Sequence, residues 1–95
     1  MAIFAVQLRF TDTERRMQVR PAHRAYLTSL RESGKLVAAG PFIDQTGAIL
    51  FYQVADEAEL REILAKDPYT AADVYEIAVL KEWQPLFPFD GSAPA

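Results

Sequence analysis

The chain has 95 residues, of which 51% are apolar, and its 10 basic and 13 acidic side chains give a net charge of −3. This length predicts one domain with a thin core, and the acidic balance argues against a general nucleic-acid binder. The sequence has no cysteine, which excludes disulfides and thiolate metal sites, and it has no run of about 18 apolar residues that would span a membrane.

The first predicted element is a strand at residues 3–10, whose even-numbered positions form an apolar face. The N-terminal segment lacks the charged region and the small-residue cleavage site of a signal peptide, so we expect a soluble cytoplasmic protein. Residues 11–19 are charged, and we expect them to lead into a helix with Thr11 or Asp12 as its cap.

A helical pattern is clear from Ala22 onward. Pro21 is expected in the first turn of this helix, where proline is tolerated, and Gly34 is expected to end it. The apolar or inward positions follow the spacing i, i+3, i+4 and i+7: His23, Tyr26, Leu27 and Leu30.

Two strands are predicted next, at residues 36–39 and 48–55. Gly40 and Pro41 close the first strand, and Gly47 is the expected pivot of the turn between the two. The first segment is short, and the second is rich in isoleucine, leucine, phenylalanine, tyrosine and valine.

The last predicted elements are a helix and a strand. Asp56 is expected to cap the helix, with Glu59 at the capping-box position. Asp67 precedes Pro68, which disfavours helical geometry at Asp67 and should end the helix there. Residues 74–83 then form the fourth strand.

The order β-α-β-β-α-β predicts an α+β protein of ferredoxin-like type, a four-stranded antiparallel sheet with both helices on one face. The last two strands are apolar on both faces, whereas a sheet with one wet face should alternate cleanly. We therefore expect a homodimer in which a second copy covers the open sheet face. The domain is predicted at residues 1–84 and an irregular tail at 85–95, where Phe87–Pro88–Phe89 either docks on a neighbouring subunit or caps its own sheet.

This topology brings the start of the first helix and the end of the second to the same edge, with His23 and Asp67 on their inward stripes. A carboxylate at a helix C-terminus opposes the macrodipole, and a neighbouring histidine would relieve this. A carboxylate also fixes the tautomer of an imidazole and raises its affinity for a proton, which suits a general acid or base. The alternative is a buried polar pair that locks the two helices together.

The other candidate residues have weaker support. Arg20, one turn before His23, is suited to a forked pair with a substrate carboxylate or phosphate, or is simply a solvated arginine. Tyr69 and Tyr75 either donate a hydrogen bond in a pocket or pack in the core. A metal site is poorly supported, because there is one histidine and no thiol, and we expect no cofactor. Three further arginines are expected on a solvated face: Arg15, Arg16 and Arg24.

The runs Val19-Arg20-Pro21-Ala22-His23, Ala39-Gly40-Pro41, Asp67-Pro68-Tyr69 and Val74-Tyr75 resemble the YciI-like (YCII-related) family. The resemblance implies a ferredoxin-like fold, a dimeric α+β barrel and an active site centred on a histidine and an aspartate. His23 and Asp67 match these two residues, and Arg20 matches the family's arginine. Ala48 stands where close members tend to have serine, and Asp73 where the family favours glycine.

Together these features predict an enzyme that needs no cofactor and acts on a small anionic molecule by lactone or ester hydrolysis, isomerisation or elimination. His23 and Asp67 are the expected catalytic residues. The expected substrate contacts are Arg20, Gly40, Pro41 and Tyr69. Two alternatives stay open: a non-catalytic module that binds a small ligand, and a structural dimerisation module in which the pair is a clamp. An oxygenase, with or without haem, ranks lower because His23 is the sole candidate haem ligand.

Overall fold

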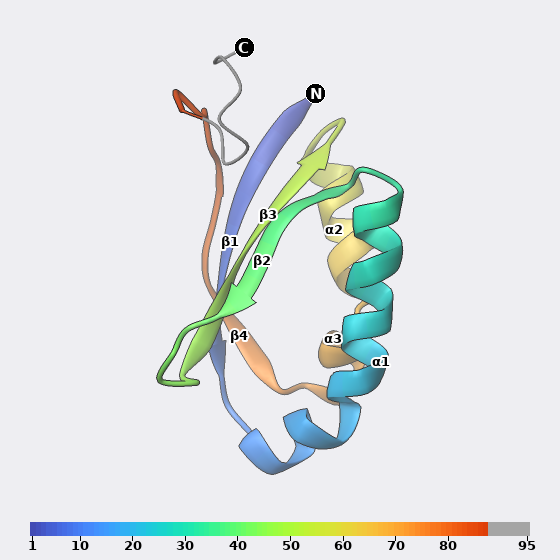
Figure 1. Ribbon diagram of the computed structural model, residues 1–95, viewed down its shortest axis with the longest axis vertical. Helices are drawn as coiled ribbons and strands as arrows, with labels where there is room; N and C mark the ends of the chain where they lie inside the picture. The colour runs from blue at the N-terminus through green and yellow to red at the C-terminus, as the bar shows by residue number, and fades with distance from the viewer. Residues whose placement is uncertain (88–95) are drawn as a thin grey trace.

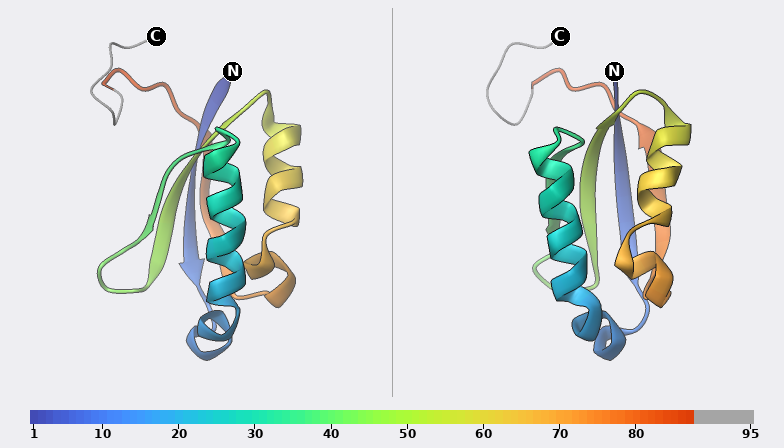
Figure 2. Two further views of the ribbon diagram at one scale, coloured as in Figure 1. Left: turned by 45° about the vertical axis from the view of Figure 1, so that its right-hand side comes forward. Right: turned by 90° about the vertical axis from the view of Figure 1, so that its right-hand side faces the viewer.

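A computed structural model describes residues 1–87 and shows one four-stranded sheet with its helices on one side (Figures 1 and 2). In chain order the elements are β1 (Ala2–Phe10), α1 (Thr13–Glu32), β2 (Leu36–Pro41), β3 (Gly47–Val54), α2 (Glu57–Ala65), α3 (Pro68–Ala72) and β4 (Tyr75–Glu82). The strand order is β2-β3-β1-β4, and every neighbouring pair is antiparallel. The predicted ferredoxin-like α+β fold is therefore confirmed. Within this part of the chain no helix is both long and apolar enough to cross a membrane.

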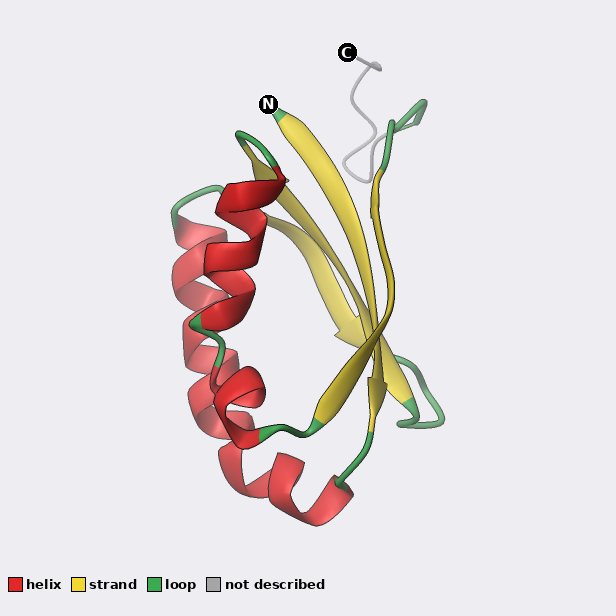
Figure 3. Cartoon of the chain, turned by 180° about the vertical axis from the view of Figure 1, so that it is seen from behind, coloured by secondary structure: helices red, strands yellow, loops and turns green. Residues whose placement is uncertain are grey.

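The core lies between the sheet and the helices. Val6 pairs with Leu50 across β1 and β3, so both side chains lie on the helix side, and both are buried. Leu60 of α2 is fully buried against this face. The alternation seen in the sequence of β1 thus places its even-numbered positions inward, as predicted. Within residues 1–87 the opposite face carries no helix (Figure 3), and side chains on it such as Ile49 are half-buried.

Helix α1 begins earlier than the sequence analysis predicts. Asp12 is its N-cap and accepts a hydrogen bond from the backbone N–H of Arg15 at 3.0 Å. Pro21 lies inside the helix and not in its first turn, so that prediction is wrong. Proline has no N–H to donate to the carbonyl of Met17, and the first turns run at an angle to the rest of α1 (Figure 1). The strong cap at Asp12 explains why the helix starts before the proline.

A short helix, α3, follows α2 and was not predicted. Helix α2 ends at Ala65, one residue before its C-cap Lys66, and Asp67 then serves as the N-cap of α3. The Asp67 carboxylate accepts a hydrogen bond from the backbone N–H of Tyr69 at 2.9 Å, and Pro68 occupies the first turn. Asp followed by Pro is the pattern that opens a helix, so the same two residues that end α2 begin α3.

The turn between β2 and β3 also differs from its prediction. Its left-handed residue is Gln45, with φ of 63°, and Gly47 is the first residue of β3. Gly47 has a different role: a Cβ built on it would lie 2.0 Å from the backbone oxygen of Leu8. The close approach of β1 and β3 therefore requires glycine at this position, although the turn does not pivot there.

At the start of α2, Glu59 makes interactions that depend on its charge. Its carboxylate accepts from the backbone N–H of Ala55 at 2.8 Å and pairs with the Lys35 ammonium at 3.0 Å. The hydrogen bond from Ala55, followed by the bond from Lys35, lowers the pKa of this carboxyl below its ordinary value of 4.5.

This lowered pKa makes the stabilisation by Glu59 dependent on pH. The contribution is complete above pH 4.5 and is lost as the pH falls through the lowered value, because the unfolded chain then binds the proton first. We expect Glu59→Gln to unfold at lower urea concentration than the wild type at pH 7, and the difference to shrink towards pH 3. The matched control is Glu62→Gln, on the exposed side of the same helix. A difference that stays constant with pH would contradict the assignment.

Candidate active site

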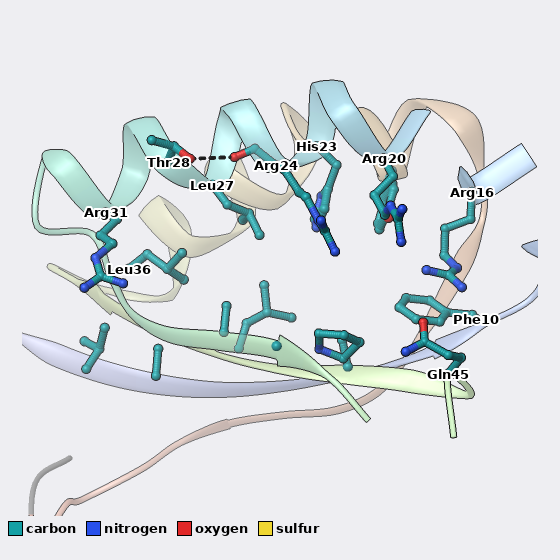
Figure 4. A pocket seen from close by; sticks show the side chains of 18 residues that line it. Phe10, Arg16, Arg20, His23, Arg24, Leu27, Thr28, Arg31, Leu36 and Gln45 are labelled. Carbon is teal, nitrogen blue, oxygen red and sulfur yellow. Dashed lines mark hydrogen bonds between the residues drawn. The ribbon is translucent and has the colours of Figure 1, made fainter. Parts of the chain in front are cut away.

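A cavity of about 420 Å³ lies between α1 and strand β2 (Figure 4). This volume suits a small organic molecule. Five of the six residues predicted for the site line it: Arg20, His23, Gly40, Pro41 and Tyr69. The sixth, Asp67, does not line the cavity but contacts His23. The structure therefore brings together the residues that the sequence pattern selected, although they come from α1, β2 and the α2–α3 junction.

His23 and Asp67 form a buried pair. The distance between His23 Nδ1 and Asp67 Oδ1 is 2.7 Å, and the two residues are 8% and 3% exposed. Asp67 follows the C-cap of α2, as predicted, but it also caps the N-terminus of α3, where the helix dipole favours a carboxylate. The predicted conflict between its charge and a helix dipole is therefore wrong. The same Oδ1 accepts the N–H of Tyr69, so the cap of α3 also fixes the oxygen that His23 contacts.

The pair determines which nitrogen of His23 is available for chemistry. An ionised carboxylate can only accept, so the hydrogen at the contact belongs to Nδ1 of His23. In the neutral imidazole the lone pair is then on Nε2, and His23 lines the cavity. The ring of Tyr69 stacks on the imidazole with centroids 3.6 Å apart and planes within 3°. Carboxylate and tyrosine together hold the imidazole in one orientation.

Two tyrosines were predicted either to donate in a pocket or to pack in the core. Tyr69 is 3% exposed, lines the cavity and packs edge-on against Phe10 at 6.2 Å. Tyr75 does not line the cavity, and its hydroxyl lies near that of Thr70. Burial raises the pKa of Tyr75 above its ordinary value of 10.0. Tyr69 is thus a wall of the site, and Tyr75 belongs to the packing around α3.

The cavity carries more positive charge than the sequence analysis predicts. Arg15, Arg16 and Arg24 were predicted on a solvated face; Arg15 and Arg24 are exposed, but Arg16 is buried. Arg16 and Arg24 line the cavity together with Arg20 and Arg31. Arg16 is 3% exposed, with its guanidinium 4.1 Å from the centre of the Phe10 ring. The signal was present: once α1 is extended back through Pro21, residues 16, 20, 23 and 27 fall on one face.

No acidic side chain of the described chain balances these charges within the cavity. Its lining residues include neither aspartate nor glutamate. In residues 1–87 the ion pairs of arginine and lysine are Arg9–Glu76, Lys35–Glu59 and Arg61–Glu57. Four of the chain's seven arginines therefore face a cavity without a carboxylate partner, in a protein whose net charge is −3. This arrangement favours an anionic ligand.

The two positions that depart from the family pattern have different consequences. Ala48 is buried and lines the cavity, so a methyl group stands where a serine would add a hydroxyl to the lining. Asp73 is exposed, ends α3 with φ of 56° and does not line the cavity. A left-handed φ explains a preference for glycine there, and aspartate tolerates it. Asp73 therefore places no carboxylate in the lining of the site.

The remaining groups in the cavity limit its chemistry. The hydroxyl of Thr28 donates to the carbonyl of Arg24 at 2.9 Å (Figure 4). Its hydrogen is therefore bound to a backbone carbonyl and not to a general base that could make Thr28 a nucleophile. Among residues 1–87 no cluster of three or more histidine, cysteine, aspartate or glutamate side chains could hold a metal ion. What the site offers is one oriented imidazole, several guanidinium groups and a partly apolar wall.

Fold and site together define the class: a ferredoxin-like domain with a buried histidine–aspartate pair beside a cationic cavity. Residues 2–84 match the model of the YCII-related domain, and the chain belongs to this family. Protein YciI of Escherichia coli O6:H1 is 38% identical over 84 residues, which cover 78% of this chain and 86% of that protein.

Two further relatives extend the comparison. The derivative of benzaldehyde biosynthesis cluster protein C of Emericella nidulans is 32% identical over 69 residues, covering 61% of this chain and 70% of that protein. A solved structure of 5-chloro-2-hydroxyhydroquinone dehydrochlorinase (TftG) from Burkholderia phenoliruptrix AC1100, in complex with 2,5-dihydroxybenzoquinone, superposes with a TM-score of 0.75 at 23% identity. This likeness covers 85% of this chain and 92% of that chain and shows a shared fold.

Proposed function

We propose that this protein is an enzyme in which His23 transfers a proton on a small anionic substrate while Asp67 orients the imidazole and stabilises its charged form. One observation carries the proposal: His23 Nδ1 is held 2.7 Å from a buried carboxylate, which leaves Nε2 as the basic nitrogen of a residue that lines a cavity. Arg20 and the arginines beside it would hold the anionic group of the substrate. No cofactor enters this proposal.

Within the reaction types that the sequence favours, the site is best suited to proton abstraction followed by elimination or isomerisation. Nε2 would take a proton from a carbon next to a carbonyl, and the C–H electrons would form a new double bond. In an elimination the leaving group departs with its electron pair, and the imidazolium then releases its proton to solvent. The dehydrochlorinase with the same fold supports this reaction type by analogy. Hydrolysis by a water molecule that Nε2 activates is the remaining alternative.

A proton-exchange experiment tests the proposal even while the natural substrate is unidentified. Small anionic carbonyl compounds would be incubated with the protein in D₂O, and NMR would follow deuterium incorporation and product formation. We expect the wild-type protein to catalyse deuterium exchange in the compounds that bind. His23→Gln should still bind these compounds, but its exchange rate should be at least about 100-fold lower. Equal exchange by His23→Gln would overturn the proposal. Saturable binding without exchange or product would favour the binding module instead.

We further propose that a second copy covers the open sheet face. Val79 of β4 is 36% exposed, and Ile49 and Phe51 of β3 are half-buried on the side away from the helices. An apolar sheet face is stable in water when a partner covers it. We expect light scattering after size exclusion to give a dimer for the wild type and a monomer for Val79→Glu. Met17→Glu, on α1, is the control and should remain dimeric; a monomeric wild type would refute the proposal.

A further inference from the structure

Arg16 is a buried cation without a polar partner among the described residues. It is 3% exposed, and its Nε atom has no hydrogen-bond partner within residues 1–87. Its guanidinium makes no ion pair there and lies over the ring of Phe10 at 4.1 Å. Phe10 and Arg16 both line the cavity. The most buried positive charge of the described chain thus borders the space that a ligand would fill.

Burial without a partner is unfavourable for the Nε–H of Arg16, because this group loses hydration and gains no hydrogen bond. The contact with Phe10 offsets part of this cost. An oxyanion that enters the cavity would supply the missing partner, and a guanidinium binds carboxylate or phosphate oxygens in a forked geometry. The unfavourable position of Arg16 in the free protein therefore indicates a ligand that carries negative charge at this end of the cavity.

The arginines near Arg16 indicate how much negative charge a ligand of this cavity should carry. Arg20 and Arg24 follow one and two helical turns later, and Figure 4 shows them beside His23 on the same side of the cavity as Arg16, with Arg31 at the far end. Among residues 1–87 no acidic side chain lines the cavity. A monoanion would neutralise one of the three neighbouring charges and leave two. A dianion leaves a smaller excess and can contact more than one guanidinium.

We propose that the site selects small dianions over monoanions and that Arg16 is the residue that determines this selection. One carboxylate of a small dicarboxylate would pair with Arg16, and the second would lie between Arg20 and Arg24, which places the atoms between them next to His23. The proposal deepens the proposed function, since it names the substrate class of the same cavity. The ligands that we propose are small dicarboxylates built on one ring, which the cavity of about 420 Å³ can hold.

The test combines binding with thermal stability in Arg16→Met. Methionine is apolar and keeps a favourable contact with the Phe10 ring. Titration calorimetry with isophthalate and benzoate should show at least a tenfold preference of the wild type for isophthalate, and Arg16→Met should lose that preference. Without ligand, the same variant should melt at least about 4 °C above the wild type, because it removes an unpartnered buried charge. Arg15→Met, on an exposed neighbour, is the matched control and should change neither quantity.

Two results would overturn the proposal: equal affinity of the wild type for isophthalate and benzoate, or an undiminished preference in Arg16→Met. A lower melting temperature of Arg16→Met would show that the arginine is structural, and this too would count against it. His23→Gln separates the two proposals. Suppose that His23→Gln prefers isophthalate as the wild type does, and that the wild type shows no proton exchange. The proposed catalysis then fails, and the selection of dianions stands. If the wild type catalyses proton exchange but binds isophthalate and benzoate equally, the selection of dianions fails and the proposed catalysis stands.

Discussion

Replacing Asp67 with asparagine is expected to lower turnover by about 10²- to 10⁴-fold while the protein stays folded. The asparagine oxygen can still accept the N–H bonds of His23 and Tyr69, because both donors meet the same oxygen in the wild type. The negative charge that stabilises the imidazolium during proton transfer is lost. Exchange or turnover rates at saturating ligand measure the loss, and urea unfolding should show a cost of about 1–3 kcal/mol.

The control for this variant is Asp73→Asn, which makes the same chemical change at an exposed residue six positions later. Asparagine accepts the left-handed conformation of Asp73, so this variant should keep its activity and stability. If Asp67→Asn loses stability but keeps full turnover, the pair is a structural clamp between α1 and α3. That outcome would support the structural interpretation and refute the catalytic one.

Gly47→Ala is expected to cause the largest loss of stability of any single methyl addition considered for this chain. The new Cβ would lie 2.0 Å from the carbonyl oxygen of Leu8, a backbone atom that no side-chain rotation can move away. Relief requires β1 and β3 to separate where they pair at Arg9 and Gly47. We expect a loss of at least about 3 kcal/mol in the free energy of unfolding, measured by urea denaturation. Such a loss is a large part of the stability of a small domain.

Gly40→Ala is the matched control, because a Cβ at Gly40 meets no atom within 4 Å and its φ is not left-handed. Alanine there should leave the free energy of unfolding within about 1 kcal/mol of the wild type. A Gly47→Ala protein as stable as Gly40→Ala would mean that β1 and β3 do not approach so closely at this point.

Much of the fold follows from local patterns in the sequence. The alternation in β1 and the capping residues Asp12 and Asp56 are strong local signals, and each corresponds to an observed element. His23 and Asp67 were also predictable, because helical spacing put both on inward faces and the order of the elements put both at one edge. The expectation that they meet is confirmed by their 2.7 Å contact. Residues 88–95 lie outside the described part of the chain, so the predictions for Pro88 and Phe89 remain untested.

The errors have local causes too. Placing Pro21 in the first turn of α1 removed Arg16 from the helix and hid its inward position. Asp67–Pro68 was predicted only to end a helix, although the same pair caps and opens α3. The burial of Arg16 could not follow from composition, since an arginine is usually exposed and its position depends on the space between α1 and the sheet. Local rules thus located the pair. The inward position of Arg16 could be read from helical spacing only once α1 is extended through Pro21, and its burial required the structure.

The two hydrogen bonds at Asp67 Oδ1 bear on how members of this family can be sorted. One oxygen of Asp67 caps α3 and also contacts His23. Natural selection for a stable fold would therefore retain the aspartate even without a catalytic role. A relative without the catalysis that we propose would still keep an Asp-Pro pair at this place, so the pair is a poor marker of the proposed activity. His23 caps no helix: its ring contacts Asp67 and Tyr69 and lines the cavity. A histidine at position 23 is therefore the more informative character for separating active from inactive lineages.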